Sequence, residues 1–122
     1  MLLAIDIGNT HIVTGILDNN GEVLLTFRVA SNDKLTEDEY FSYLRNISEF
    51  NKIDIKKVEG IIVASVVPNL ITIFQFLGKK YFHIDPMIVG PDIKIPFTFA
   101  PNLNPTGFGA DRIIDIVQSL ND

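Results

Sequence analysis

The chain is predicted to fold as an α/β domain built on a mixed five-stranded sheet. It opens with three strand-like segments joined by short turns, which predicts an antiparallel meander. From residue 36 onward, segments with helical apolar spacing alternate with short β-rich runs, which predicts crossovers between parallel strands. The length of 122 residues fits one domain.

The first three elements are strands. Leu2–Ile7 is apolar on both faces, which is typical of a central strand. A second strand is predicted over His11–Leu17, and the turn formers of 18–21 (Asp-Asn-Asn-Gly) predict a tight return into a third strand over 22–30.

The remaining elements alternate. Thr36 and Glu39 form a capping-box pattern, so a helix is predicted over Glu37–Phe50. A buried strand over 61–67, a helix starting at Pro68 and a short strand at Met87–Val89 follow. After a long loop over 91–105, apolar residues at i, i+3, i+4 and i+7 predict a last helix: Ile113, Ile116, Val117 and Leu120. The predicted order, β-β-β-α-β-α-β-α, is that of a ribonuclease-H-like lobe.

Composition excludes several kinds of partner. The net charge is −5 and no basic cluster is present, which argues against nucleic acid as a partner. Cysteine is absent and only two histidines occur, which excludes disulfides and thiolate or histidine-rich metal sites. The longest apolar stretch is far short of the ~20 residues of a spanning helix, so no membrane segment is expected. No signal peptide is apparent, and a cytoplasmic location is expected by exclusion.

The turn after the first strand is a candidate phosphate site. Asp6 ends a strand expected to be buried, where a carboxylate needs a partner or a metal, and it could hold a hydrated Mg²⁺. Gly8 is expected to adopt positive φ and to let a ligand approach, while Asn9 and Thr10 offer short polar side chains beside main-chain amides. The alternative is a plain two-residue hairpin turn centred on Gly8 and Asn9, which leaves Asp6 unexplained.

A second candidate site lies at 109–112 (Gly-Ala-Asp-Arg), where the last helix begins. A helix N-terminus favours anions, so Asp111 there would stay ionised as a general base and Arg112 would offer donors to a carboxylate or phosphate. The structural alternative is an ordinary N-cap aspartate followed by a solvated arginine.

Taken together, these motifs resemble those of the type III pantothenate kinases, in the actin-like ATPase superfamily. Residues 6–11 are similar to the family's first nucleotide motif, 63–68 to a recurrent segment, and 109–112 to its pantothenate motif, with Asn104 and Pro105 before it. The family resemblance runs from Met1 to about Asp115.

The resemblance implies ATP-dependent phosphorylation of pantothenate, the first step toward coenzyme A. It implies that Asp111 is the catalytic base, that Gly109, Ala110, Asp111 and Arg112 bind pantothenate, and that Asp6 binds the metal. It also implies that eight consecutive residues line the ATP phosphates: Asp6, Ile7, Gly8, Asn9, Thr10, His11, Ile12 and Val13. Family members use a divalent metal, respond to a monovalent cation (K⁺ or NH₄⁺) and form homodimers.

Two departures from the family pattern stand out. A tyrosine common in relatives shortly before the Asn-Pro pair is replaced here by residues 101–103, Pro-Asn-Leu, and residues 106–108 are less polar than usual. The family has two lobes, so residues 1–122 are expected to form an N-terminal lobe that is inactive without the C-terminal lobe. The alternative functions are a non-enzymatic actin-like regulatory or interaction module and another sugar- or acetate-kinase-like enzyme.

Overall fold

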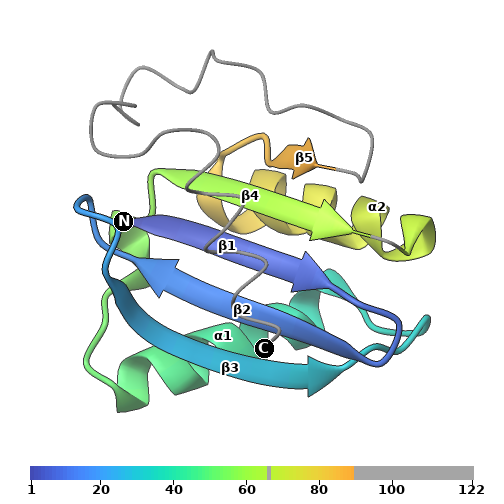
Figure 1. Ribbon diagram of the computed structural model, residues 1–122, viewed down its shortest axis with the longest axis horizontal. Helices are drawn as coiled ribbons and strands as arrows, with labels where there is room; N and C mark the ends of the chain where they lie inside the picture. The colour runs from blue at the N-terminus through green and yellow to red at the C-terminus, as the bar shows by residue number, and fades with distance from the viewer. Residues whose placement is uncertain (66, 90–122) are drawn as a thin grey trace.

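A five-stranded sheet forms the centre of the molecule. The computed structural model describes residues 1–65 and 67–89 (Figure 1). The strands are β1 (Leu2–Ile7), β2 (His11–Leu17), β3 (Val23–Ala30), β4 (Gly60–Ser65) and β5 (Met87–Val89). Their order in the sheet is β3-β2-β1-β4-β5. The β1–β2 and β2–β3 pairs are antiparallel, whereas β1–β4 and β4–β5 are parallel, so the mixed five-stranded sheet is confirmed.

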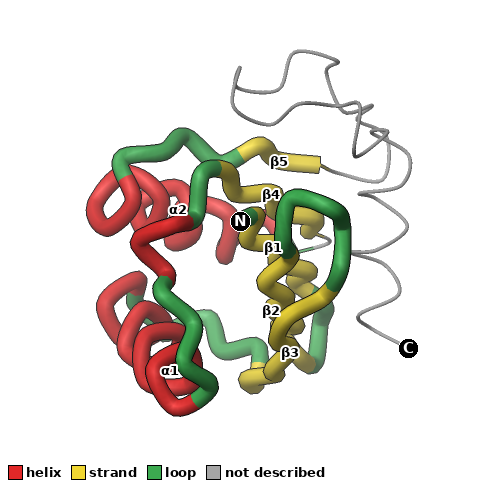
Figure 2. Tube along the Cα trace, turned by 90° about the vertical axis from the view of Figure 1, so that its left-hand side faces the viewer, coloured by secondary structure: helices red, strands yellow, loops and turns green. Residues whose placement is uncertain are grey.

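Two helices, α1 (Glu37–Phe50) and α2 (Pro68–Leu77), pack on the same face of this sheet (Figure 2). The strand residues that face them alternate along each strand, as period-2 geometry requires. On β1 they are Leu3, Ile5 and Ile7, all fully buried in the core. Full burial of each such side chain contributes about 1.5–3 kcal/mol, so this face stabilises the strand that carries the site.

A buried tyrosine joins the helices to the sheet. Tyr40 of α1 lies fully buried and forms a hydrogen bond between its hydroxyl and that of Thr14 on β2. Its ring packs edge-to-face on Phe74 of α2, with the ring centroids 4.8 Å apart. Burial raises the pKa of Tyr40, which therefore stays neutral and only structural.

Helix boundaries follow the capping signals. The Thr36 side chain accepts a hydrogen bond from the Glu39 amide at 3.1 Å, as the capping-box pattern predicts. Pro68 occupies the first turn of α2, where its missing N–H has no cost. The predictions for β1, β2, α1 and β5 are confirmed residue for residue.

Other boundaries differ from the predictions. The fourth strand covers Gly60–Ser65 rather than 61–67, because the Ser65 hydroxyl accepts a bond from the Val67 amide and turns the chain before Pro68. The third strand begins at Val23 because Glu22 belongs to the preceding turn. A 3₁₀ turn at Ile55–Lys57 and a π-helical segment at Gly78–Phe82 were not predicted. The predicted last helix, with Ile113, Ile116, Val117 and Leu120, lies outside the described residues.

One end of the molecule gathers the features expected of a ligand site. The parallel strands β1 and β4 end there, and both helices begin there (Figure 1). Ligands of open α/β sheets bind beyond the carboxyl ends of the strands, close to helix N-termini. The β1–β2 turn, which contains the predicted phosphate motif, lies at this end.

Candidate phosphate-binding site

Asp6 is the acidic residue of the site. It lies on the sheet face opposite α1 and α2, between Val13 of β2 and Ala64 of β4 in the register. The sequence predicted that Asp6 is largely buried, but the structure shows it only partly buried. Burial nevertheless raises the pKa of its carboxyl group. A carboxylate held where its charge is disfavoured is suited to a cation that arrives with a ligand.

The turn between β1 and β2 is a tight hairpin. The Gly8 amide donates to the His11 carbonyl at 2.9 Å, so the central residues are Asn9 and Thr10. The turn is a hairpin, as that alternative expected, but it is centred on Asn9 and Thr10 rather than on Gly8 and Asn9. Asn9 and Thr10 are both exposed at the tip, where a ligand can reach them.

Gly8 serves this turn differently from the prediction. It does not have the positive φ expected of it; Gly21 is the glycine with a positive φ in the described ranges, 1–65 and 67–89. A Cβ atom at Gly8 would lie 3.1 Å from the His11 carbonyl oxygen, tighter than ordinary contact. Glycine is needed here because the backbone on the two sides of the hairpin comes so close.

The carbonyl and amide groups of the turn differ in their hydrogen bonding. Both the Gly8 and the Thr10 carbonyls accept hydrogen bonds from Ser31, at 2.6 Å from its hydroxyl and 2.8 Å from its amide. Within the part of the chain that the structure describes, the Asn9 and Thr10 amides have no acceptor. Successive main-chain amides that are exposed in a turn can form a concave site whose N–H groups bind phosphate oxygens.

The other residues of the predicted phosphate motif contribute unequally. The side chains of Ile7 and Ile12 lie in the core under the helices, which leaves their main chain as the part that could meet a nucleotide. Val13 is buried on the opposite face, beside Asp6. His11 is partly exposed on that same face.

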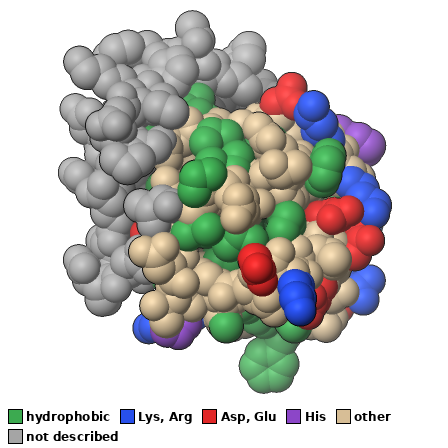
Figure 3. Space-filling model, turned by 90° about the vertical axis from the view of Figure 1, so that its right-hand side faces the viewer, with side chains coloured by type: hydrophobic (Ala, Val, Ile, Leu, Met, Phe, Trp, Pro, Cys, Tyr) green, Lys and Arg blue, Asp and Glu red, His purple; other side chains and the backbone are tan. Residues whose placement is uncertain are grey.

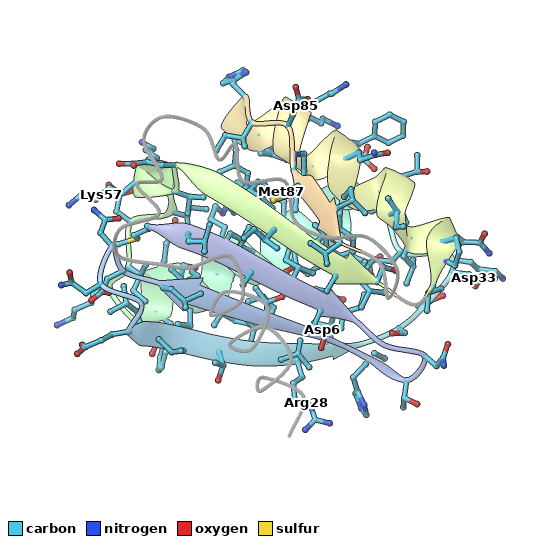
Figure 4. All side chains as sticks on the ribbon, turned by 45° about the horizontal axis from the view of Figure 1, so that its top comes forward. Asp6, Arg28, Asp33, Lys57, Asp85 and Met87 are labelled. Atoms are coloured by element: carbon cyan, nitrogen blue, oxygen red, sulfur yellow. The ribbon has the colours of Figure 1, made fainter. Side chains whose placement is uncertain are left out.

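A basic residue that the sequence analysis did not single out joins the site. Arg28 of β3 lies on the Asp6 face, in line with Val13 (Figure 4). Its guanidinium Nη2 lies 3.3 Å from Nδ1 of His11, within hydrogen-bond distance. Strand alternation alone predicts that Arg28 lies on the face away from the helices. Its place beside His11 and Val13 also requires the register of β3 on β2.

An open hollow of about 320 Å³ adjoins the turn. Its walls come from the turn, from the β3–α1 connection and from the start of α2, and they comprise Asn9, Ser31, Asn32, Asp33, Val67 and Leu70. Figure 3, which views this end of the molecule, shows acidic and basic side chains next to one another along the edge of the described surface, and no basic patch among the side chains that it colours. Among the described residues, the groups available to a phosphate here are therefore main-chain amides rather than a cluster of cations.

The residues present fit a metal that comes with a nucleotide. Among residues 1–65 and 67–89, no three His, Asp or Glu side chains are grouped to hold an ion. Mg²⁺ in kinases is usually held by one or two carboxylates together with phosphates and water, and the partly buried Asp6 carboxylate meets that requirement.

The second predicted site lies outside the described residues. This applies to Gly109, Ala110, Asp111 and Arg112 and to the loop over 91–105 that precedes them.

Among the described helices, none is long and apolar enough to span a bilayer.

Comparison with known proteins gives consistent relatives. The family model described as type III pantothenate kinase matches residues 2–121. A type III pantothenate kinase of Fusobacterium nucleatum is 62% identical over 120 residues, covering 98% of this chain and 47% of the relative. One of Shouchella clausii is 39% identical over 120 residues, covering 98% of this chain and 46% of the relative.

Solved structures are more distant. A Listeria monocytogenes protein matches with a TM-score of 0.45 and 19% identity, over 73% of this chain and 34% of that one. A Ppx/GppA family member from Aquifex aeolicus matches with a TM-score of 0.40 and 18% identity, over 74% and 35%.

Sequence and geometry lead to one assignment. The chain spans about half the length of the curated relatives that it matches. The family match nevertheless covers nearly all of its residues and includes both the turn after β1 and the segment 109–112. The chain belongs to the type III pantothenate kinase family.

Proposed function

We propose that this chain supplies part of the active site of an enzyme that phosphorylates pantothenate with ATP to form 4'-phosphopantothenate. The observation that carries the proposal is the 62% identity to a type III pantothenate kinase over 98% of the chain. The exposed turn residues Asn9 and Thr10, which follow the strand that carries Asp6, support it independently.

In this proposal each candidate residue has a defined role. The amides of the turn bind phosphate oxygens of ATP, and Asp6 binds the accompanying Mg²⁺. Asp111 accepts the proton of the pantothenate hydroxyl, while Gly109, Ala110 and Arg112 hold pantothenate. Phosphoryl transfer depends mainly on positioning and on neutralising charge, which these groups supply.

Several further properties belong to the proposal. The chain forms an N-terminal actin-like lobe, and a second lobe completes the ATP site and binds the monovalent cation. One lobe alone leaves the phosphates open to water, so the isolated chain is expected to be inactive. The complete enzyme is proposed to be a cytoplasmic homodimer.

The test is reconstitution. This chain is mixed with the half of the Fusobacterium nucleatum relative that it does not match, and ATP-dependent phosphorylation of pantothenate is measured. The proposal expects activity in the mixture, none in either half alone, and loss of activity when the chain carries Asp111→Asn. The asparagine keeps the size of the side chain but cannot accept the proton.

One outcome would overturn the proposed function, and another would overturn the role given to Asp111. If the halves associate but pantothenate is not phosphorylated, the interaction-module function is favoured instead. If Asp111→Asn retains full activity, Asp111 is not the base.

A further inference from the structure

We propose that Ser31 is a positioning residue that holds the phosphate turn with the Asn9 amide directed at the ligand. Ser31 directly follows β3, yet it bonds to two residues of a turn more than twenty positions earlier in the chain. Its hydroxyl donates to the Gly8 carbonyl at 2.6 Å, and its amide donates to the Thr10 carbonyl at 2.8 Å. The two acceptors belong to the residues before and after Asn9, so Ser31 is hydrogen-bonded to the turn on both sides of its tip.

Because the peptide group is planar, these two hydrogen bonds also fix the direction of the amide that follows each carbonyl. In a trans peptide the C=O of one residue and the N–H of the next point in opposite directions within one plane. Holding the Gly8 carbonyl against Ser31 therefore directs the Asn9 amide away from Ser31. Holding the Thr10 carbonyl fixes the His11 amide in the same way. The two carbonyl oxygens, which would repel an anion, are occupied by Ser31.

Ser31 is itself held in place by the connection to α1. The Asn32 carbonyl accepts from the Leu35 amide at 3.0 Å, and the Asn32 side chain accepts from the Lys34 amide at 2.9 Å. Leu35 is buried, and Thr36 then caps α1. The turn is thus braced by a structured loop rather than by its own side chains, which preorganises the donors before a phosphate arrives.

This inference rests on the proposed function, because it assumes that the turn binds the phosphates of ATP. The experiment compares Ser31→Ala with Ser31→Thr, which keeps the hydroxyl, and with Ser42→Ala, an exposed serine on α1 that serves as a matched control. Two measurements are made on each variant. The first is the NMR chemical shift and the order parameter of the Asn9 and His11 amides in this chain without ligand. The second is the KM for ATP and for pantothenate in the reconstituted mixture.

The expected result is specific to Ser31. Ser31→Ala should shift both amides and lower their order parameters, and it should raise the KM for ATP about tenfold while the KM for pantothenate stays within twofold. Ser31→Thr should restore the amides and bring the KM for ATP to within threefold of the starting chain, and Ser42→Ala should change neither.

Failure of this inference can be told from failure of the proposed function. If Ser31→Ala leaves the Asn9 and His11 amides unchanged, Ser31 does not position the turn, whether or not the mixture is active. If it lowers the melting temperature but leaves the KM for ATP unchanged, Ser31 is only structural. An inactive mixture whose amides still respond to Ser31→Ala counts against the phosphate function and leaves the bracing confirmed.

Discussion

The two hairpin turns that flank β2 differ in which main-chain groups they leave available. In the turn at 18–22, the Asp18 carboxylate accepts from the Asn20 amide at 2.8 Å and the Glu22 amide at 3.0 Å. The Gly21 amide donates to the Asp18 carbonyl at 3.2 Å. This turn satisfies most of its own donors. In the turn after β1, by contrast, Ser31 occupies the carbonyls, and the Asn9 and Thr10 amides are left without an acceptor among the described residues.

The difference separates a turn that stabilises from a turn that can bind. Asp18 is an internal acceptor, so the turn at 18–22 has little left for an anion. In the turn after β1 the acidic residue, Asp6, belongs to the strand rather than to the turn itself. Both turns contain Asn and Gly and have an Asp at or shortly before their start, so the composition alone does not distinguish them.

The largest effect should come from exchanging each turn's carboxylate for an amide. Asp6→Asn should lower pantothenate phosphorylation in the reconstituted mixture by roughly 10²–10³-fold, because it removes the charge proposed to hold Mg²⁺. Asp18→Asn should change activity by less than twofold, since an asparagine oxygen can still accept both amides. The initial rate at saturating pantothenate is the measurement.

Equal losses at the two positions would contradict this comparison, because they would show a shared structural role. Urea unfolding of both variants provides the control. Asp6→Asn should not lower the free energy of unfolding at pH 7, since the lost carboxylate is one whose ionised form is disfavoured by burial.

Replacing the glycines of the two turns should have smaller effects. Gly21→Ala should mainly lower stability, whereas Gly8→Ala should mainly raise the KM for ATP. Gly21 has a φ of 88°, so Gly21→Ala should cost about 1–2 kcal/mol in stability and leave the KM for ATP unchanged. Gly8→Ala places a Cβ 3.1 Å from the His11 carbonyl oxygen, which forces the hairpin apart. It should raise the KM for ATP about tenfold, the same change expected of a loosened turn, with about 1 kcal/mol lost in stability.

Urea unfolding and ATP kinetics on the same two variants decide the point. A Gly8→Ala variant that loses stability but keeps its KM for ATP would show that the close approach at Gly8 matters only for the hairpin.

The sequence predicted the elements of the sheet well because their signals are local. Leu2–Ile7 is apolar at every position but one, and Thr36 with Glu39 marks the start of α1 three residues apart. Such patterns depend on burial and capping within a few residues. The π-helical segment at Gly78–Phe82 escaped prediction because it follows from packing: a Cβ at Gly78 would lie 2.6 Å from the Ile84 carbonyl oxygen.

The candidate site was only partly predictable for the same reason. The motif at Asp6 to Thr10 can be read from the chain, but the role of Gly8 cannot, since glycine is equally suited to positive φ and to close approach. Arg28 and Ser31 reach the site through the pairing of β3 with β2. No local pattern records that pairing, and residues distant in sequence become partners only once the register is known.

The smallest effect expected is a pH dependence that belongs to the Asp6 turn. Burial raises the pKa of Asp6 above its ordinary value of 3.8, so the unfolded chain ionises this group at lower pH than the folded chain does. Relative to Asp6→Asn, the starting chain should therefore be most stable below that ordinary value. It should lose stability as the pH rises through the raised pKa of the folded state. Urea unfolding of both proteins between pH 3 and pH 8 measures the difference. Adding Mg²⁺ and ATP to the reconstituted mixture should reduce it, because a bound cation favours the ionised carboxylate. A difference in stability that does not change with pH would mean that the Asp6 carboxyl is as well solvated in the folded chain as in the unfolded one, and the contrast between the two turns would then rest on their amides alone.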